Sequence, residues 1–337
     1  MTVSVKVDIH PSQFPDKIQR DLIASLRTRR VNHKFHYDSA KQTQKWLALH
    51  EFHSPARYDA ECQTTYDRAF AAAVAQIKAR QVHLIGLGCG GGQKDVQLMK
   101  QLKARGKLFS YTPCDVSVAM VLVARHAACA LVQSKNCFPF VCDLATADSL
   151  PEQFAHAPMA KAPRLITFFG MIPNFEPRKI LPKLTDLLRP NDCLLFSANL
   201  APSDDYAAGM RKILPQYDNP LTHDWLMAFL FDLGVERQDG RLCFSIKTGG
   251  LGLQRVVARF HFQRARRIKV GDRKFSFARG DSIRLFFSYR YTPALIRKLL
   301  ERHDLDVFGE WLAKSAEEGV FFCRRKHADR LENFQRV

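Results

Sequence analysis

Between residues 81 and 200, short apolar runs alternate with longer segments in which apolar residues recur at helical spacing. Five runs are typical of buried strands: residues 81–88, 108–115, 137–144, 163–170 and 193–200. Three segments are typical of helices: residues 95–106, 117–132 and 176–188. Strands that alternate with helices form βαβ units with right-handed crossovers. The pattern therefore predicts an α/β fold, a doubly wound Rossmann-like sheet that binds ligands at the carboxyl ends of its strands.

The segments on either side of this region follow other patterns. Residues 1–60 are polar and predict irregular structure, whereas residues 217–234 predict a helix. Apolar–polar alternation is typical of antiparallel strands with one solvated face, and it occurs at residues 241–248, 253–270 and 274–291. We expect a further helix at 292–305 and a last strand at 319–325.

These patterns predict two domains. Residues 61–202 and 289–337 are expected to form the nucleotide-binding domain. Residues 1–60 and 203–288 are expected to form a second, α+β lobe. This lobe would cover the edge of the sheet where ligands bind.

The first predicted strand leads into a glycine-rich loop, GLGCGGGQKD at residues 86–95. Its spacing fits G-x-G-x-x-G, in which the glycines let the backbone approach a nucleotide closely. Asp115 stands at the end of the next strand, where an acid binds ribose hydroxyls. Dinucleotide-dependent oxidoreductases and S-adenosylmethionine (SAM) methyltransferases share these features, so the loop alone leaves both cofactors open.

Two charged side chains favour SAM. The cation Lys94 in the loop fits the carboxylate of SAM, whereas a pyrophosphate is bound by backbone N–H groups at a helix N-terminus. Asp143, at the end of the third strand, is placed to accept a hydrogen bond from an adenine amino group. Capping of a helix N-terminus is the alternative role for Asp143.

Several sequence elements resemble, in the same order, the histidine-specific SAM-dependent methyltransferases of ergothioneine biosynthesis. The segment GMIPNF (170–175) resembles the family's acceptor motif G-S-T-I-G-N-F, and its Asn174 follows the fourth strand. The other matching elements are the glycine loop, FHYDSA (35–40), SPARYDAE (54–61) and FFSYRYTP (286–293). The likeness extends from about residue 35 to residue 325 and implies the fold of class I methyltransferases.

The resemblance implies a role for each matching residue. The residues that would bind SAM are Gly86, Gly88, Gly90, Lys94, Asp115 and Asp143. Asn174 and Tyr217 would hold the head group of an amino-acid substrate, and Tyr37 would lie close to the reacting amine. Ser288 would contact the substrate side chain. Asn174 and Tyr37 are therefore the candidate catalytic residues.

Three substrate positions depart from the family pattern. Phe286 replaces a glutamate that helps to bind the imidazole, His53 stands where the family has a tyrosine, and Pro173 replaces a glycine. Loss of a carboxylate that pairs with a polar ring removes a charge-assisted hydrogen bond worth about 1.5–3 kcal/mol. We therefore expect a SAM-dependent N-methyltransferase that acts on the amino group of an amino acid or related small amine other than histidine.

Composition adds an expected location and leaves the partners open. The first thirty residues lack the apolar block of a signal peptide, no apolar run is long enough to span a bilayer, and nine cysteines occur without a CxxC pair. We expect a soluble, cytoplasmic protein without a metal site, and a monomer. The formal net charge of +18 fits a solvated basic face, an anionic substrate or nucleic acid. No RNA-recognition signature accompanies this charge, but methylation of a nucleic acid or protein stays an alternative.

Overall fold

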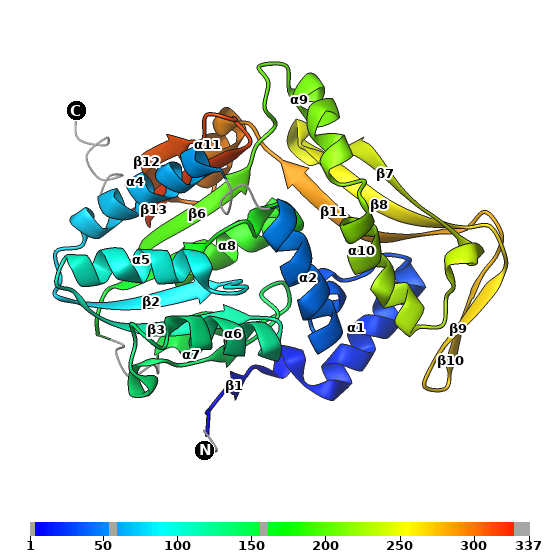
Figure 1. The fold of residues 1–337 in the computed structure, drawn as a ribbon, viewed down its shortest axis with the longest axis horizontal. Helices are drawn as coiled ribbons and strands as arrows, with labels where there is room; N and C mark the ends of the chain where they lie inside the picture. Colours follow the sequence, from blue (N-terminus) through cyan, green and yellow to red (C-terminus); the bar gives the residue numbers. More distant parts are fainter. Residues whose placement is uncertain (1–3, 54–58, 156–160, 327–337) are drawn as a thin grey trace, which may run out of the picture.

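A mixed sheet lies at the centre of the molecule (Figure 1). The computed structural model describes residues 4–53, 59–155 and 161–326. Within this part of the chain, eight strands have the order β1-β4-β3-β2-β5-β6-β13-β12. Their bounds are β1 Asp8–Ile9, β2 Gln81–Leu87, β3 Leu108–Asp115, β4 Phe140–Val141, β5 Arg164–Phe168, β6 Cys193–Asn199, β12 Leu305–Leu312 and β13 Glu318–Arg325. The strands from β1 to β6 in this order are parallel, whereas β13 is antiparallel to both of its neighbours.

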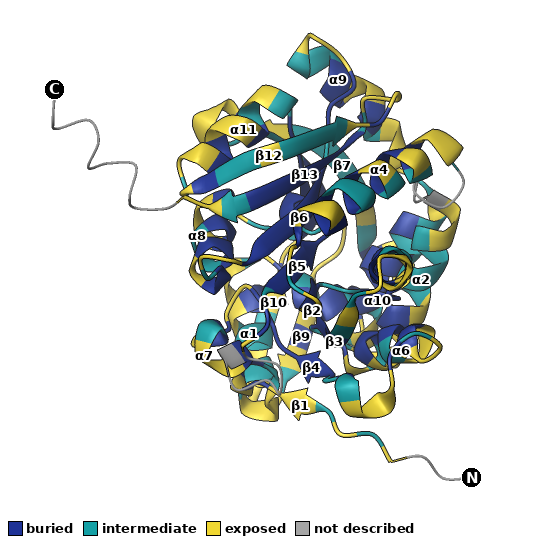
Figure 2. Cartoon of the chain, turned by 90° about the vertical axis from the view of Figure 1, so that its left-hand side faces the viewer, coloured by how far each residue is buried: buried dark blue, intermediate teal, exposed yellow. Residues whose placement is uncertain are grey.

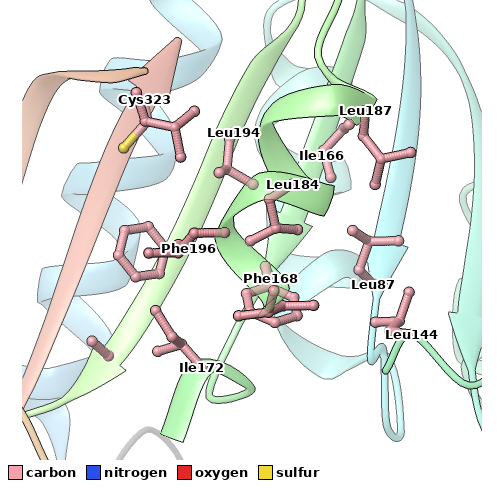
Figure 3. Close-up of a cluster of buried hydrophobic side chains, with 14 of the residues drawn as sticks. Leu87, Leu144, Ile166, Phe168, Ile172, Leu184, Leu187, Leu194, Phe196 and Cys323 are labelled. Carbon is pink, nitrogen blue, oxygen red and sulfur yellow. The ribbon is translucent and has the colours of Figure 1, made fainter. Parts of the chain in front are cut away.

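Helices cover both faces of this sheet. One face packs against α4 (Ala60–Gln76), α5 (Gln93–Ala104) and α6 (Val118–Ala128), and the other against α7 (Leu150–Ala155), α8 (Pro177–Leu187) and α11 (Pro293–Glu301). Successive residues of β6 point into opposite cores. Cys193 and Leu195 share a core with α4 and α5, whereas Leu194 and Phe196 pack with residues of α8 (Figure 3). Since a strand buried on both faces is a continuous apolar run, this packing explains the sequence pattern and confirms the predicted doubly wound α/β fold.

The central strands β2 and β5 lie next to each other where the chain reverses its course across the sheet. From β2 the chain passes through α5 to β3 and then to β4, whereas from β5 it passes through α8 to β6 on the other side. The loops that follow such a pair of strands diverge and leave a crevice at the carboxyl edge of the sheet. The glycine loop after β2 and residues 169–176 after β5 therefore border the same crevice.

A second lobe packs against this edge (Figure 1). Its helices are α1 (Pro15–Thr28), α2 (Ala40–His53), α9 (Tyr206–Ile213) and α10 (Pro220–Asp232). Its strands are β7 (Gly240–Thr248), β8 (Gln254–Phe262) and β11 (Ser282–Arg290), which form an antiparallel sheet, and the hairpin of β9 (Arg266–Val270) and β10 (Arg273–Phe277). Leu26 of α1, Trp225 of α10 and Phe260 of β8 belong to one core. This core unites N-terminal residues with residues from the 225–286 region, while the exact domain boundaries stay a prediction.

The N-terminal segment differs from the expected irregular structure. It forms α1 and α2, and its strand β1 pairs with β4 of the central sheet. Ile18, Leu22 and Leu26 recur every four residues along α1 and pack in the lobe core. The positions between them hold the apolar residues Ile23 and Ala24 as well as polar ones, which obscures the helical face in the sequence. The pattern also did not predict α4, α7, α9 and β12, and the expected strand at 137–144 is reduced to the two residues of β4.

Burial follows this layered arrangement. Figure 2 shows the central strands β5, β6 and β13 as buried and the outward faces of the surrounding helices as exposed. None of the described helices is long and apolar enough to cross a membrane.

Candidate active site

A cavity of about 510 Å³ lies at the carboxyl edge of the sheet. One wall consists of the glycine loop, the ends of β3 and β4, and residues 169–176, and the other consists of residues from the segment 30–50 and from β11. Small-molecule ligands commonly occupy cavities of roughly 300–1,000 Å³, so the volume suits such a ligand. The predicted site residues that line it are Tyr37, Gly88, Gly90, Lys94, Asp115, Asp143 and Asn174.

The glycine loop brings its backbone to the cavity at two positions where a side chain would not fit. Gly88 has a φ of +65° and Gly90 a φ of +52°, conformations that favour glycine. A Cβ at Gly88 would overlap the side chain of Met171, and a Cβ at Gly90 would lie 3.0 Å from the Trp46 ring. Both glycines therefore permit close approach between the loop and the neighbouring wall.

Gly86 has a packing role instead. It belongs to β2 and does not line the cavity, and a Cβ there would overlap the buried carboxylate of Asp95. Asp95 accepts hydrogen bonds from the hydroxyls of Tyr111 and Thr167, both at 2.7 Å. Burial raises the pKa of Asp95 to about 6, against the effect of these hydrogen bonds. Gly86 thus leaves room for a carboxylate beneath the loop.

Asp115 ends β3 in the wall of the cavity and is buried. Its two carboxylate oxygens accept hydrogen bonds from the backbone N–H groups of Gly90 and Ser117, both at 3.1 Å. Since a carboxylate has about four acceptor positions, each oxygen keeps capacity for a ligand hydroxyl. Burial raises the pKa of Asp115 to about 6, while the backbone hydrogen bonds counteract the rise. This arrangement can bind a ribose diol.

Asp143 lines the same cavity and caps a turn. Its carboxylate accepts hydrogen bonds from the backbone N–H of Ala145 and the hydroxyl of Thr146, both at 2.9 Å. These groups belong to the turn that follows β4, so the predicted alternative of a helix cap is replaced by a turn cap. The backbone N–H of Asp143 donates to the hydroxyl of Ser12 at 3.0 Å. The N-terminal segment therefore supports the site, which the sequence pattern did not predict.

Lys94 lies in the first turn of α5, and its ammonium group already has protein partners. It donates a hydrogen bond to the hydroxyl of Tyr66 at 2.5 Å and lies 3.4 Å from a carboxylate oxygen of Glu318. The Tyr66 hydroxyl also donates to Glu318. A ligand carboxylate at Lys94 would therefore compete with Glu318. Sequence spacing gave no sign of this partner, which belongs to β13.

Asn174 and Tyr37 supply polar groups to the cavity from its two walls. Asn174 ends the 3-10 turn Ile172–Asn174, and no group among the described residues hydrogen-bonds its side-chain amide. Tyr37 packs edge-on against Trp225 and Trp46, with ring centroids 5.4 and 6.1 Å apart, and its hydroxyl also lacks a partner in the described chain. Burial and then the charge of Asp115 raise the pKa of Tyr37, so the phenol stays protonated at neutral pH.

The remaining predicted substrate residues are placed elsewhere. Phe286 is buried in the lobe core, with its ring centroid 5.4 Å from that of Trp225. Ser288 is hydrogen-bonded to the hydroxyl of Tyr217 at 2.9 Å, and neither residue lines the cavity. The side chain of His53 lies outside the described residues. Their contact with a substrate stays a prediction.

A β-bulge explains why their neighbours line the cavity instead. The register between β11 and β8 shifts between Arg284 and Phe286. Leu285 is therefore an extra residue, and the alternation of side chains between the two faces of the strand is reset. Arg284 and Phe287 line the cavity, together with His33 of the lobe. Apolar–polar alternation in the sequence gave no signal for this bulge.

Comparisons with solved structures found methyltransferases of low sequence identity. A methyltransferase from Streptomyces caelestis, CcbJ, has a TM-score of 0.39 and 14% identity, with 77% of this chain and 95% of that chain covered. Magnesium protoporphyrin IX methyltransferase from Synechocystis has a TM-score of 0.44 and 13% identity, with 86% and 96% covered. A 1,6-didemethyltoxoflavin N1-methyltransferase from Burkholderia thailandensis has a TM-score of 0.41 and 11% identity, with 85% of this chain and 89% of that chain covered. Similarity at this level carries no information about substrate or residue roles. No curated protein matches the sequence significantly.

Comparison with protein families identifies the chain more directly. The family described as "Histidine-specific methyltransferase, SAM-dependent" matches residues 18–211 and 252–325. The matched residues contain the glycine loop, both acids and the segment after β5. They also contain β8 and β11 of the lobe. The chain therefore belongs to the family of histidine-specific, SAM-dependent methyltransferases.

Proposed function

We propose that this SAM-dependent methyltransferase transfers a methyl group to the amino group of an amino acid or related small amine other than histidine. One observation carries the proposal. The Asn174 amide and the Tyr37 hydroxyl line the same cavity as Asp115 and the glycine loop, and neither has a hydrogen-bond partner among the described residues. Polar groups left free beside a cofactor acid are suited to bind a substrate.

The cavity residues fit SAM. The Asp115 carboxylate keeps acceptor capacity for the ribose hydroxyls, and Asp143 keeps one acceptor position on each oxygen for the adenine amino group. Lys94 would bind the methionine carboxylate, in exchange for part of its contact with Glu318. Bound SAM supplies a methyl group on a positively charged sulfur, a leaving group that needs no further activation.

The chain's own contribution to catalysis is mainly positioning. Methyl transfer requires the acceptor nitrogen to present a lone pair, and burial of an ammonium beside another positive charge lowers its pKa. The Asn174 side-chain oxygen can accept from the amine N–H and thereby orient its lone pair, which raises the effective concentration of the nucleophile. Because the pKa of Tyr37 is raised, its phenol acts as a hydrogen-bonding group and not as a base. The released proton passes to water.

The acceptor side of the cavity argues against histidine as the substrate. Recognition of an imidazole by a carboxylate is strongest where no other cation already balances the negative charge. Glu176 is the acid on this side among the described lining residues. Its two oxygens each accept one hydrogen bond, from Arg255 and from the hydroxyl of Tyr289, both at 2.8 Å, and the ion pair with Arg255 already balances its charge. The position where the family has its glutamate is Phe286, in the lobe core.

Transfer of labelled methyl groups from SAM to a panel of amino acids and amines, with histidine included, tests the proposal. We expect transfer to at least one amine and none to histidine. The variant Asn174→Ala should retain its affinity for S-adenosylhomocysteine while turnover falls by about 100-fold or more, because positioning accounts for most of the rate. Unchanged turnover in this variant, or histidine as the best acceptor, would contradict the proposal. So would transfer to RNA or protein with no transfer to small amines.

A further inference from the structure

The face of the lobe sheet that looks toward the cavity carries several arginines. Arg284 of β11 lies directly opposite Arg259 of β8. Arg255 lies four residues before Arg259 and hence on the same face of β8. Arg30 forms an isolated bridge with Arg284 and lines the cavity beside it. Like charges directly opposite on neighbouring strands destabilise a sheet, so this arrangement costs stability in the absence of an anion.

The carboxylate next to this group does not balance it. Glu176 pairs with Arg255 at 2.8 Å. No ion pair to Arg284, Arg259 or Arg30 occurs among the described residues. The lobe side of the cavity therefore has an excess of positive charge, and an anion is the ligand that this excess favours.

Arg284 is the arginine best placed to meet such an anion. Its guanidinium packs 4.9 Å from the centroid of the Phe287 ring, and its Nε is buried without a hydrogen-bond partner. Burial, followed by the charges of Arg255, Arg30 and Arg259, lowers the pKa of Arg284 to about 10. The side chain therefore still carries its charge at neutral pH.

His33 provides an independent sign of a missing partner at the same place. Its ring packs against Phe287 and Phe286, with centroids 4.6 and 5.0 Å apart. Both ring nitrogens are buried without a hydrogen-bond partner, although buried polar atoms are normally bonded. Burial lowers the pKa of His33 well below its usual value, so the ring is neutral and offers one N–H donor.

We propose that the methyl acceptor must carry a carboxylate, and that Arg284 binds this carboxylate with His33 as a second donor. The proposal rests on the proposed function and narrows it: amines that lack an anionic group would be poor acceptors. The planar guanidinium matches a carboxylate with two parallel hydrogen bonds. The rings of Phe287 and His33 provide an apolar surface for the part of the acceptor next to the carboxylate.

Ligand titration tests the proposal without turnover. The probes are 3-phenylpropionate and its uncharged amide, titrated by calorimetry into the full chain with and without S-adenosylhomocysteine. The wild type should bind the carboxylate about 10- to 100-fold more tightly than the amide, the range for hydrogen bonds to a charged group. Arg284→Gln should lose this preference. Arg284→Lys should keep part of it, since a lysine retains the positive charge but not the planar group that makes two parallel hydrogen bonds.

A matched control separates local from general effects of charge. Arg267→Gln removes one positive charge at an exposed position of strand β9 in the same lobe and should leave both affinities unchanged. Equal binding of carboxylate and amide by the wild type would overturn the proposal. Equal losses in Arg284→Gln and Arg267→Gln would also overturn it, because long-range charge would then be the cause.

Turnover provides the second measurement. Methyl transfer to phenylalanine should be faster than transfer to phenethylamine, which lacks the carboxylate. Arg284→Gln should remove this difference in rate. A wild type that favours phenethylamine contradicts the proposal. If no amine is methylated although S-adenosylhomocysteine binds, the proposed function fails, whereas the titration still decides whether Arg284 binds a carboxylate.

Discussion

Replacement of Asp115 by asparagine would keep the size of this side chain while removing the charge that the proposed ribose contact requires. Each carboxylate oxygen now accepts one backbone N–H, from Gly90 or Ser117. Asparagine has one acceptor oxygen and one donor group, so one of these N–H groups would lose its partner. The substitution therefore perturbs both the glycine loop and the bound ribose.

The raised pKa of Asp115 sets the size and sign of the effect on stability. A rise from 3.8 to about 6 corresponds to about 3 kcal/mol at 1.36 kcal/mol per pKa unit. Because the folded state holds its proton more tightly than the unfolded state, this contribution is fully present below pH 3.8 and is lost as the pH rises through about 6. As the pH rises from about 4 to about 8, the unfolding free energy of the wild type should therefore fall by about 3 kcal/mol relative to that of Asp115→Asn.

Binding should show the opposite trend with pH. If the ionised Asp115 binds the ribose, the affinity of the wild type for S-adenosylhomocysteine should be about tenfold lower at about pH 5 than at about pH 8. At the higher pH, Asp115→Asn should bind about 10- to 100-fold more weakly than the wild type. Asp95, whose pKa is also raised to about 6, remains in both proteins and cancels in the comparison.

Calorimetric titration across this pH range, together with urea unfolding of the protein without ligand, measures both effects. Asp95→Asn serves as a control for the second buried acid, which lies beneath the loop. The reasoning is refuted if Asp115→Asn keeps the affinity and the pH profile of the wild type. It is also refuted if Asp95→Asn, and not Asp115→Asn, abolishes the pH dependence of binding.

Three further substitutions probe separate features. Gly88→Ala should destabilise the protein by more than the roughly 1 kcal/mol expected from left-handed strain alone, since its Cβ would overlap Met171. Gly106→Ala is the matched control in urea unfolding, because Gly106 has a similar φ and no atom within 4 Å of the added Cβ. Equal losses of unfolding free energy in the two variants would contradict the reasoning. Asp192→Asn should lower the unfolding free energy by about 3–5 kcal/mol, because Asp192 and its partner Arg164 are almost fully buried and 2.6 Å apart. The control Asp224→Asn, which breaks an exposed pair with Arg237, should lower it by at most about 1 kcal/mol. Comparable losses in the two variants would count against this interpretation. Lys94→Met should weaken binding of S-adenosylhomocysteine by about 10-fold or more, measured by calorimetry, and an unchanged affinity would remove Lys94 from the cofactor site.

The central fold was accessible from the sequence because its strands are buried on both faces. Residues such as Leu194, Leu195 and Phe196 contribute to both cores, which leaves a continuous apolar run in the sequence. Helix α1 was not accessible in the same way. Ile18, Leu22 and Leu26 occupy a narrow apolar face, and only the lobe core, which forms from distant segments, gives this face a partner. Strand β12 lies at the edge of the sheet and is mostly half-exposed, so its apolar pattern is weak.

The grouping of the candidate cofactor residues on one cavity could be predicted because these residues follow the carboxyl ends of strands. Position along the chain then fixes position in space, and Lys94, Asp115 and Asn174 lie on one cavity. The partner of Lys94 could not be predicted, since Glu318 reaches it through strand pairing late in the chain. A contact between segments that are far apart in the sequence leaves no local pattern.

The acceptor side depends on one inserted residue in β11. With regular alternation, Arg284, Phe286 and Ser288 would share one face of the strand. Leu285 disrupts this alternation, so Arg284 instead shares a face with Phe287, while Phe286 faces the lobe core. A resemblance in sequence assigns roles by position along the strand, and it does not show which face of the sheet each side chain points to after a bulge. The specificity of this chain therefore has to be sought at Arg284 and Phe287, where a cation and a ring meet the cavity, and this placement is what makes a carboxylate-bearing acceptor the sharper hypothesis.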